Sequence, residues 1–554
     1  MAGRKLIVII DGHAGGEGEV AEWQRRALAS LPAHDELSLL VCTNTRLKRQ
    51  PLRYPLYYAL NLLAVRNPLT RSVPLGALTA RIAGQRAFAS GQDGAWQVLP
   101  DEIVDHIAAS GAQAVIKLGM GLMRVPARLS VPILSWHHGD PAHFRGRPAG
   151  FWELLAGRET IGQIVQVIGN RLDAGAIVAF AETRVLGHSW RGTLMESFRH
   201  SPLLLAPALD NAIAGRTLDR PVSGRNYRLP GNMAVARLIL KMGAAKMRRL
   251  LYGAFFEKRW RVSLAPTGGE NGAGFAEAVL SGTASLPPEA DWQTPAIPRG
   301  CTFIADPFFG PDGTSLLVEA LSARSGKGEI YRIDPPGGSV PVVGVKVSGD
   351  PGHHSYPAMV DQDGAPYCVP EIAQWSAPAA FRLNDTGWER AFDLDIEGSP
   401  RLTDPTFLRH DGRLYLFAND AREGSNVLRL WSADGLAARF TQHPASPLRI
   451  SPRGARMGGE FLARNDGAAN GRILRIGQDF TRDYGDGLVV FAIDALDEQS
   501  YRESEVAAFR LGRRHGPHTF NLSPDGSRLL FDWYTNGFTP LAGVRRALAR
   551  LRRN

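Results

Sequence analysis

Short turns of the Asp-Gly or Asn-Gly type recur along the second half of the chain and constrain its fold more than any other feature of the sequence. They stand at intervals of 51, 48, 59 and 55 residues, at Asp312-Gly313, Asp363-Gly364, Asp411-Gly412, Asn470-Gly471 and Asp525-Gly526. Such dipeptides preferentially close two-stranded hairpins, and a run rich in β-forming residues follows each of them. A repeat of about 50 residues with several strands in each copy is typical of propeller blades. The sequence therefore predicts an all-β five-bladed propeller in this half.

Polar residues recur at fixed places relative to these turns. Six or seven residues after the glycine of each turn stand Glu319, Glu371, Asn419, Gln478 and Asp532. A second set precedes the turns and comprises Asp306, His354 and Asp404. Equivalent positions in equivalent strands should form a ring about the propeller axis, although strand ends are also polar simply because they are exposed. Clustered carboxylates beside aromatic residues suit sugar binding, so we expect Asp306, His354, Glu371 and Asp404 to contact a substrate.

The first half of the chain alternates strand and helix patterns. Short apolar runs at 6–11, 37–43, 114–118 and 133–136 predict buried strands, and the periodicity of 20–31 and 100–110 predicts helices. Alternation of this kind favours an α/β domain of the Rossmann type, with a mostly parallel wound sheet. In such sheets ligands bind at the carboxyl ends of the strands. The site of the first half is therefore expected at that edge.

A histidine and an aspartate follow two of these strands. His137 comes directly after the strand predicted at 133–136, and Asp173 lies in a turn after the strand predicted at 160–168. A nearby carboxylate holds an imidazole in one tautomer and favours its charged form. We expect the two side chains to meet at one sheet edge and to transfer protons during attack on a carbonyl. The alternative is that His137 is a structural histidine.

The residues around this pair resemble the folate-dependent formyltransferases. In that family a strand ends in Asn-x-His, an Arg-Gly-x-Pro turn follows, and an Asp sits in an Asp-x-Gly loop. The matching segments here are Ser135–Trp152, which contains Arg145-Gly-Arg-Pro148, and Leu172-Asp-Ala-Gly175. The resemblance covers about residues 1–215 and implies that an amine attacks the formyl carbon of 10-formyltetrahydrofolate. It implies an acid/base role for His137 and Asp173.

The resemblance also implies roles for the neighbouring residues. Ser135 and Asp140 are expected to contact the reacting centre, and Arg145 to contact the substrate. The segment 117–123 resembles the family's folate loop, so the cofactor is expected at Leu118, Gly119, Met120 and Gly121. One departure is plain, because Ser135 stands where the family has an asparagine that donates to the developing oxyanion. Losing such a donor typically costs about 2.7–4 kcal/mol of barrier.

The second half resembles two kinds of five-bladed protein. One is the β-fructosidase and arabinanase type of glycosidase, whose catalytic carboxylates surround the axis. The closer resemblance is to the amino-terminal domain of plant glucosamine inositolphosphorylceramide transferases. It is carried by Phe303–Phe309, His354–Pro357, Pro370-Glu371, Arg456–Gly459, Gln478-Asp479, Tyr484-Gly485 and His518–Phe520. Both resemblances imply a carbohydrate ligand, and binding without hydrolysis is the interpretation that we favour.

Together the two halves predict a domain order and a function. We expect a formyltransferase-like α/β domain at 1–215, a linker and basic helix at 216–252, the propeller at 253–540 and a basic tail at 541–554. The predicted enzyme transfers a formyl group from 10-formyltetrahydrofolate to the amine of an amino sugar or glycoconjugate that the propeller holds. The alternative is a carbohydrate-binding or glycoside-processing propeller of polysaccharide metabolism with a degenerate formyltransferase domain.

Charge and cysteine content indicate which binding partners and which cellular location to expect. The net charge of +10 is concentrated at 241–261 and in the tail 545–553, and both segments read as helices with a basic face. We expect these basic faces to be exposed to solvent, and contact with an anionic membrane surface is the alternative. We do not expect the protein to bind nucleic acid. The three cysteines are far apart and predict neither a disulfide framework nor a metal site. Because neither a signal peptide nor a membrane-spanning run is predicted, we expect a cytoplasmic protein.

Overall fold

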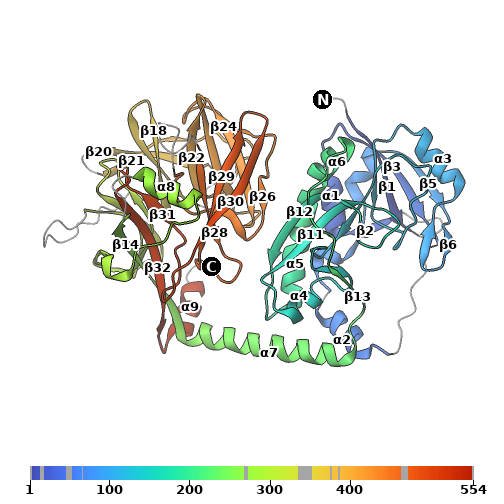
Figure 1. Ribbon diagram of the computed structural model, residues 1–554, viewed down its shortest axis with the longest axis horizontal. Coiled ribbons are helices and arrows are strands. Elements are labelled where there is room, and N and C mark those ends of the chain that lie inside the picture. Colours follow the sequence, from blue (N-terminus) through green and yellow to red (C-terminus); the bar gives the residue numbers. More distant parts are fainter. Residues whose placement is uncertain are drawn as a thin grey trace. The chain divides into compact units, whose positions relative to one another are not determined.

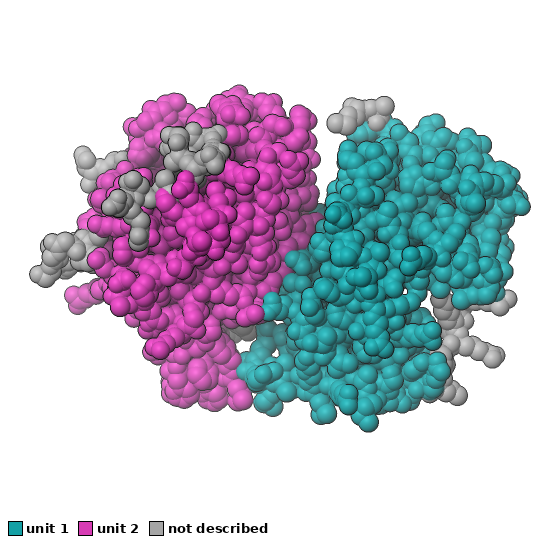
Figure 2. Space-filling model, viewed as in Figure 1, with its two compact units in different colours: residues 1–249 teal, residues 250–554 magenta. Residues whose placement is uncertain are grey.

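The computed structural model describes residues 3–12, 18–44, 53–64, 66–267, 272–334, 352–372, 374, 377–384, 387–462 and 472–551. The chain divides into two compact units, residues 1–249 and residues 250–554 (Figure 2). The first unit combines a central sheet with helices, and the second consists mainly of β-sheets (Figure 1).

One seven-stranded sheet forms the centre of the first unit. Its order is β12-β11-β9-β8-β1-β3-β5. β1 pairs in parallel with β3 and β8, and β11 runs antiparallel to both of its neighbours, so the sheet is mostly parallel, as predicted. Chain order reverses between β1 and β8, and ligands of such sheets bind near a reversal of this kind. The strands are β1 (Lys5–Asp11), β3 (Glu36–Cys42), β5 (Ile82–Phe88), β8 (Ala114–Lys117), β9 (Ile133–His137), β11 (Thr160–Val167) and β12 (Ala176–Arg184).

Helices and short two-stranded pairs surround this sheet. The helices are α1 (Glu22–Ala29), α2 (Pro55–Ala64), α3 (Asp101–Ala109), α4 (Phe151–Ala156), α5 (Trp190–His200) and α6 (Leu205–Ile213). The short pairs are β2 (Glu19–Ala21) with β4 (Ser72–Pro74), β6 (Gly91–Asp93) with β7 (Trp96–Val98), and β10 (Phe144–Gly146) with β13 (Arg225–Tyr227). The helix expected at 20–31 begins later, because residues 19–21 pair as a strand instead.

A glutamate buried in the first turn of α4 gives the first unit a pH-dependent stability. Glu153 is 3% exposed, and burial raises its pKa to about 7 although amides of Glu153 and Gly150 oppose the shift. The unfolded glutamate titrates near 4.5. Between these values the folded chain keeps a proton that the unfolded chain has lost, so the free energy of unfolding falls as pH rises.

The Glu153→Gln variant is expected to remove this dependence. Relative to the wild type, it should gain on the order of 3 kcal/mol of stability above pH 8 and little below pH 4.5. Urea unfolding across this range measures the difference. The control is Glu102→Gln, which changes an exposed glutamate in the first turn of α3. Parallel pH profiles of the wild type and Glu153→Gln would contradict the prediction.

Within the described residues the second unit has five main sheets, and each is one blade. The first is β15 (Cys301–Phe309), β16 (Leu316–Ser322) and β17 (Gly328–Ile333); the second is β18 (Ser355–Gln362), β19 (Ala365–Glu371), β20 (Ala379–Asn384) and β21 (Gly387–Asp393). The third is β22 (Leu402–His410), β23 (Arg413–Asp420), β24 (Val427–Ala433) and β25 (Thr441–Gln442), with β26 (Arg449–Ile450) beside β24. The fourth is β27 (Arg453–Met457), β28 (Leu474–Asp479), β29 (Leu488–Leu496) and β30 (Tyr501–Phe509). The fifth is β14 (Phe256–Pro266), β32 (Arg528–Phe538) and β31 (Phe520–Leu522).

The first strands of successive blades meet around a common axis. β15 contacts β18, β18 contacts β22, β22 contacts β27, and β31 contacts β15. The fifth blade closes the ring, because β14 from the start of the unit pairs with β32 from its end. This arrangement is the predicted five-bladed propeller.

The predicted hairpin turns lie where the repeat placed them. Those at Asp363-Gly364 and Asp411-Gly412 join the first two strands of their blades, and all four residues have positive φ, as two-residue hairpin turns of type I′ require. Asp312-Gly313 and Asp525-Gly526 connect the corresponding strands of the first and fifth blades. The turn predicted at Asn470-Gly471 lies outside the described residues.

Three further helices complete the described chain. They are α7 (Asn232–Phe255), α8 (Gly272–Leu280) and α9 (Ala542–Leu551) in the basic tail. α7 contains the basic helix predicted between the halves, but the helix expected over 241–261 ends at Phe255, because residues 256–266 pair with β32 as β14. Among the described residues, none of the helices is both long enough and apolar enough to span a bilayer. The three cysteines are free thiols, and Cys42 and Cys368 are buried.

Candidate functional site

The predicted histidine–aspartate pair of the first unit comes together at the carboxyl end of the sheet. His137 ends β9, and Asp173 follows β11 with a φ of 44°. His137 Nδ1 lies 3.5 Å from an Asp173 carboxylate oxygen, and the other oxygen accepts the Gly146 amide at 2.9 Å. His137 Nε2 lies 3.3 Å from the Phe144 carbonyl. Each ring nitrogen thus faces an oxygen acceptor, and a neutral imidazole could donate to only one of them.

The other predicted catalytic residues surround this pair with their own partners. Ser135 lies two residues before His137 on β9, on the same face of the strand. Asp140 shapes the turn after β9, since its carboxylate accepts the Ala142 amide at 3.0 Å and lies 3.3 Å from Arg220. Arg145 donates to the Gly224 carbonyl at 2.8 Å. These contacts fix the loop that covers the carboxyl end of β9.

The predicted folate loop follows β8 at the reversal of strand order. The amides of Leu118 and Gly119 donate to the Ile9 carbonyl, and the Met120 amide donates to Asp11 at 2.7 Å. The Met120 side chain belongs to the core of the sheet. Gly121 is exposed. The loop is therefore a rigid shelf, in which the amides of Leu118, Gly119 and Met120 are already bonded within the unit and Gly121 is the exposed residue.

In the second unit, a repeated backbone bulge presents three residues near the axis. Asp306, Tyr356 and Asp404 each precede a proline, have φ between 46° and 48°, and lie where the pairing register of the first strand shifts. A bulge re-aims a side chain and increases local twist, and left-handed backbone at a non-glycine residue is held only where the surrounding structure enforces it. Tyr356, not His354, occupies the place equivalent to the two aspartates.

A cavity of about 350 Å³, here called the axial cavity, opens beside these strands. It combines aromatic rings with ionisable groups from several blades. Its lining includes Trp260, Phe303, Tyr484, Asp306, Glu319, Glu371, Arg456, His353 and His518. Trp260 stacks on His518 with ring centroids 4.2 Å apart, and Tyr484 meets the same imidazole edge-on at 5.3 Å. Aromatic rings and charged side chains thus lie in contact with one another in the lining of the cavity.

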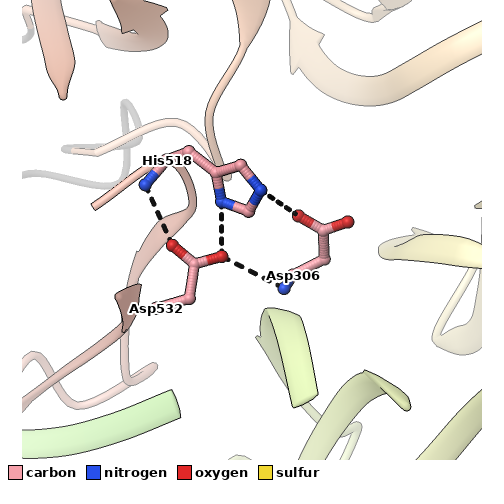
Figure 3. A group of neighbouring side chains, drawn as sticks. All are labelled: Asp306, His518 and Asp532. Atoms are coloured by element: carbon pink, nitrogen blue, oxygen red, sulfur yellow. Dashed lines mark hydrogen bonds and ion pairs between the residues drawn. The ribbon is translucent and has the colours of Figure 1, made fainter. Parts of the chain in front are cut away.

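His518 lies between two carboxylates in the wall of this cavity (Figure 3). Its Nδ1 is 2.5 Å from Asp532, and its Nε2 is 3.6 Å from Asp306. Asp532 also accepts the amides of His518, Thr519 and Asp306, which fixes its orientation. Burial alone would lower the pKa of His518, but the two carboxylates raise it. Burial raises the pKa of Asp306 to about 6 against the opposing effect of His518.

The same three side chains have the donor types of a metal site. Their ligand atoms all lie within 4.8 Å of one another. A cation bound through His518 Nδ1 would replace the contact of that atom with Asp532, whereas a cation bound through Nε2 could leave this contact in place. Without a cation, the three side chains form an ion-paired group in which His518 lies between Asp306 and Asp532.

A second charged cluster borders the cavity around Arg456. This guanidinium donates to both carboxylate oxygens of Asp404 and lies 3.5 Å from Glu371. Gln478 donates to Asp404 at 2.7 Å. Burial and neighbouring carboxylates raise the pKa values of Glu371 and Glu319 well above the usual range. These two carboxyl groups are therefore biased toward the protonated form, which can donate a hydrogen bond.

The predicted ring of polar residues is present in part. Glu319 and Glu371 line the cavity, Gln478 and Asp532 hold its charged residues, and Asn419 instead donates to the carbonyls of Val427 and Ala455. His354 is buried, whereas its neighbours His353 and Ser355 line the cavity. Sequence reasoning did not select Trp260, Arg456, Tyr484 or His518 as ligand contacts. Three of these belong to segments that carry the resemblance of the second half.

Comparison with known proteins supports the resemblance of the second unit. The family described as "Glucosamine inositolphosphorylceramide transferase 1, N-terminal" matches residues 293–523. Glucosamine inositolphosphorylceramide transferase 1 of Arabidopsis thaliana is 26% identical over 230 residues, which cover 40% of this chain and 29% of that protein. The chain thus spans less than a third of the length of the curated relatives it matches.

Solved structures similar to each unit were also found. A β-xylosidase (RS223) covers 38% of this chain and 79% of its own, with 14% identity and a TM-score of 0.29. A sugar N-formyltransferase from Shewanella sp. covers 43% of this chain and 87% of its own, with 12% identity and a TM-score of 0.27. Residues 293–523 are thus similar to the amino-terminal region of glucosamine inositolphosphorylceramide transferases, as the sequence indicated, and formyltransferases are among the similar structures.

Proposed function

We propose that the second unit binds a carbohydrate in the axial cavity. The observation that carries this proposal is the combination of aromatic rings and ionisable side chains in the lining of one cavity of about 350 Å³. That volume lies in the range of roughly 300–1,000 Å³ typical of small-molecule sites. A sugar ring presents apolar C–H faces and a rim of hydroxyl groups. Trp260 can cover such a face while Asp306, Glu371 and Arg456 bond the rim.

The protonation states of the cavity suit hydroxyl recognition. Glu319 and Glu371, with raised pKa values, can donate as well as accept, whereas the Asp404 carboxylate is bonded by Arg456 and Gln478. A hydrolase needs one carboxyl group as acid and a second one free to act as base or nucleophile. Because Asp404 is engaged in this way, we propose binding rather than hydrolysis.

The Asp306→Asn variant tests the carbohydrate site. It keeps the shape and the left-handed backbone, which asparagine tolerates, but removes a charged hydrogen-bonding group worth about 1.5–3 kcal/mol. We expect affinity for an oligosaccharide selected from a panel of neutral, amino and acidic glycans to fall about ten- to hundredfold by calorimetry. The control is Asp395→Asn, an exposed aspartate of the same unit. Unchanged affinity in Asp306→Asn would exclude the axial cavity as the binding site.

We further propose that the first unit transfers a formyl group to the amine of an amino sugar or glycoconjugate. The specific support is the contact of His137 with Asp173 at the carboxyl end of the sheet. 10-Formyltetrahydrofolate would supply the formyl carbon, held at Leu118, Gly119, Met120 and Gly121. His137 would take the proton that the attacking amine loses and return it to the cofactor nitrogen as the bond between that nitrogen and the formyl carbon breaks. Asp173 would orient the imidazole and stabilise its charge. Ser135 and Asp140 would lie nearest the reacting carbonyl, and Arg145 near the acceptor.

Calorimetric titration with a stable 10-formyltetrahydrofolate analogue tests the folate part of this proposal. We expect binding of the wild type in the micromolar range, with little change in Asp173→Asn, because Asp173 lies in a different loop from the predicted shelf. Failure of the folded wild type to bind the analogue would exclude folate-dependent transfer. It would leave the carbohydrate site of the second unit unaffected.

A further inference from the structure

The long helix α7 has two apolar faces, and the protein core covers only one of them. Val235 and Leu238 are fully buried in a cluster with Tyr57 of α2, Phe151 of α4 and Trp190 of α5. A second apolar row, Met233, Leu240 and Met247, is 70%, 74% and 56% exposed. At 3.6 residues per turn, spacings of seven place these three side chains in one row along the helix. The row lies about half a turn from Val235 and Leu238, so it faces away from the core.

Basic residues border this exposed row. Arg237, Lys241 and Arg248 follow members of the row by one or four positions, which places them along its edge. The whole helix, residues 232–255, carries five basic residues and no aspartate or glutamate. A helix with an apolar face flanked by cations is typical of segments that lie in the plane of a membrane interface. Packing within the first unit accounts for one of these cations, because Lys241 donates to the Leu155 carbonyl at 3.1 Å. It does not account for the exposed apolar row.

Helix α2 extends the apolar surface beside the start of α7. Its Tyr57 is in the same buried cluster as Val235, and Figure 1 shows α2 next to the amino-terminal end of α7. The side chains of Leu56, Leu62 and Leu63 are 43%, 53% and 78% exposed. Scattered apolar residues are normal on protein surfaces, but several exposed apolar side chains on two neighbouring helices are typical of an interaction surface.

We propose that α7, together with α2, docks on the surface of an anionic lipid membrane. The row Met233, Leu240 and Met247 enters the region between headgroups and acyl chains, and the flanking arginine and lysine side chains contact lipid phosphates and carboxylates. Charge favours this occupant over a second copy of the chain, because pairing two copies of α7 would bring five positive charges against five. It also fits a peripheral mode of attachment, since none of the described helices can cross a bilayer. The proposal does not depend on the proposed function of either unit.

Flotation of the full-length protein with vesicles tests the proposal. Phosphatidylcholine vesicles containing phosphatidylserine should carry the protein, and phosphatidylcholine alone should carry far less. Raising the salt concentration from about 0.1 to 1 M shortens the Debye length from about 10 to 3 Å and should release it. Equal flotation with neutral and anionic vesicles, or flotation with neither, would overturn the proposal.

Two double variants separate the apolar and the charged contributions. Arg237→Gln/Arg248→Gln should weaken partitioning onto anionic vesicles by on the order of tenfold or more. Arg324→Gln/Arg513→Gln removes the same charge from exposed residues of the second unit and should leave partitioning nearly unchanged. Leu240→Gln/Met247→Gln should reduce it while the far-ultraviolet circular dichroism stays native. The wild type could instead be a dimer by light scattering, and Leu240→Gln/Met247→Gln a monomer. That result would show that the surface binds a second copy of the chain and not a membrane.

Discussion

The Glu503→Gln variant is expected to lose about 3–5 kcal/mol of the free energy of unfolding of the second unit, the usual cost of leaving a buried charge without its partner. Glu503 on β30 accepts two hydrogen bonds from Arg475, at 2.7 and 2.8 Å, and the Arg475 side chain is fully buried. Arg449 and Tyr501 bond the same carboxylate at 2.8 and 2.6 Å. A glutamine keeps the size of the side chain but leaves the Arg475 cation uncompensated between two strands of the fourth blade.

The neighbouring Glu505 provides a matched control. It lies on the same strand and also accepts two bonds from an arginine, Arg453, but its side chain is 43% exposed. Exposed pairs contribute about 0–1 kcal/mol, so Glu505→Gln should hardly shift the urea midpoint. Similar losses in the two variants would show that burial does not set the strength of the Glu503 pair.

The same pair should make the second unit sensitive to acid. Burial alone would raise the pKa of Glu503, but Arg475 lowers it to about 2, below the ordinary value of 4.5. The folded carboxylate therefore stays charged where the unfolded one is protonated. Its contribution to stability is present above pH 4.5 and is lost as pH falls toward 2. Glu503→Gln should lack this part of the acid dependence.

The fold of the second unit could be predicted because its signals are local and repeated. A turn such as Asp411-Gly412 depends on the backbone freedom of two adjacent residues, so the dipeptide itself indicates the hairpin. Strand β5 was missed for the opposite reason. Its residues, Ile82–Phe88, lie at the edge of the sheet and are mostly exposed, so they show neither an apolar run nor an alternating pattern.

The candidate sites were predicted to different degrees. His137 and Asp173 were paired correctly from the sequence, although β11 runs antiparallel to β9 and the carboxyl ends of the two strands lie at opposite edges of the sheet. The loop that follows β11 brings Asp173 back to His137. Trp260 and His518, by contrast, stack although 258 positions separate them, since β14 joins β32 to close the ring of blades. A closure of this kind has no local pattern. The correct equivalent of Asp306 in the second blade, Tyr356, could have been found from the proline that follows each of them.

Formyl transfer, when assayed with an amino-sugar acceptor, is expected to fall about 10²–10⁴-fold in the His137→Ala variant, the range that a positioned acid/base group supplies. Asp173→Asn should also lower the rate, because the amide cannot balance the charge of a protonated imidazole. Asparagine tolerates the left-handed backbone of Asp173, so loop geometry is preserved. His143→Ala is the matched control, since His143 is exposed and lies six residues beyond His137 in the same segment.

Separate measurements of folate binding and of the catalytic rate in each variant distinguish the possible roles of His137 and Asp173. A positioning role for Asp173 predicts that Asp173→Asn lowers kcat with little change in KM for the folate. A merely structural role predicts instead a loss of stability, with residual activity proportional to the folded fraction. If His137→Ala bound the folate analogue normally and transferred formyl at the wild-type rate, the proton would have to pass through another group, and the assignment of the site to His137 and Asp173 would be wrong.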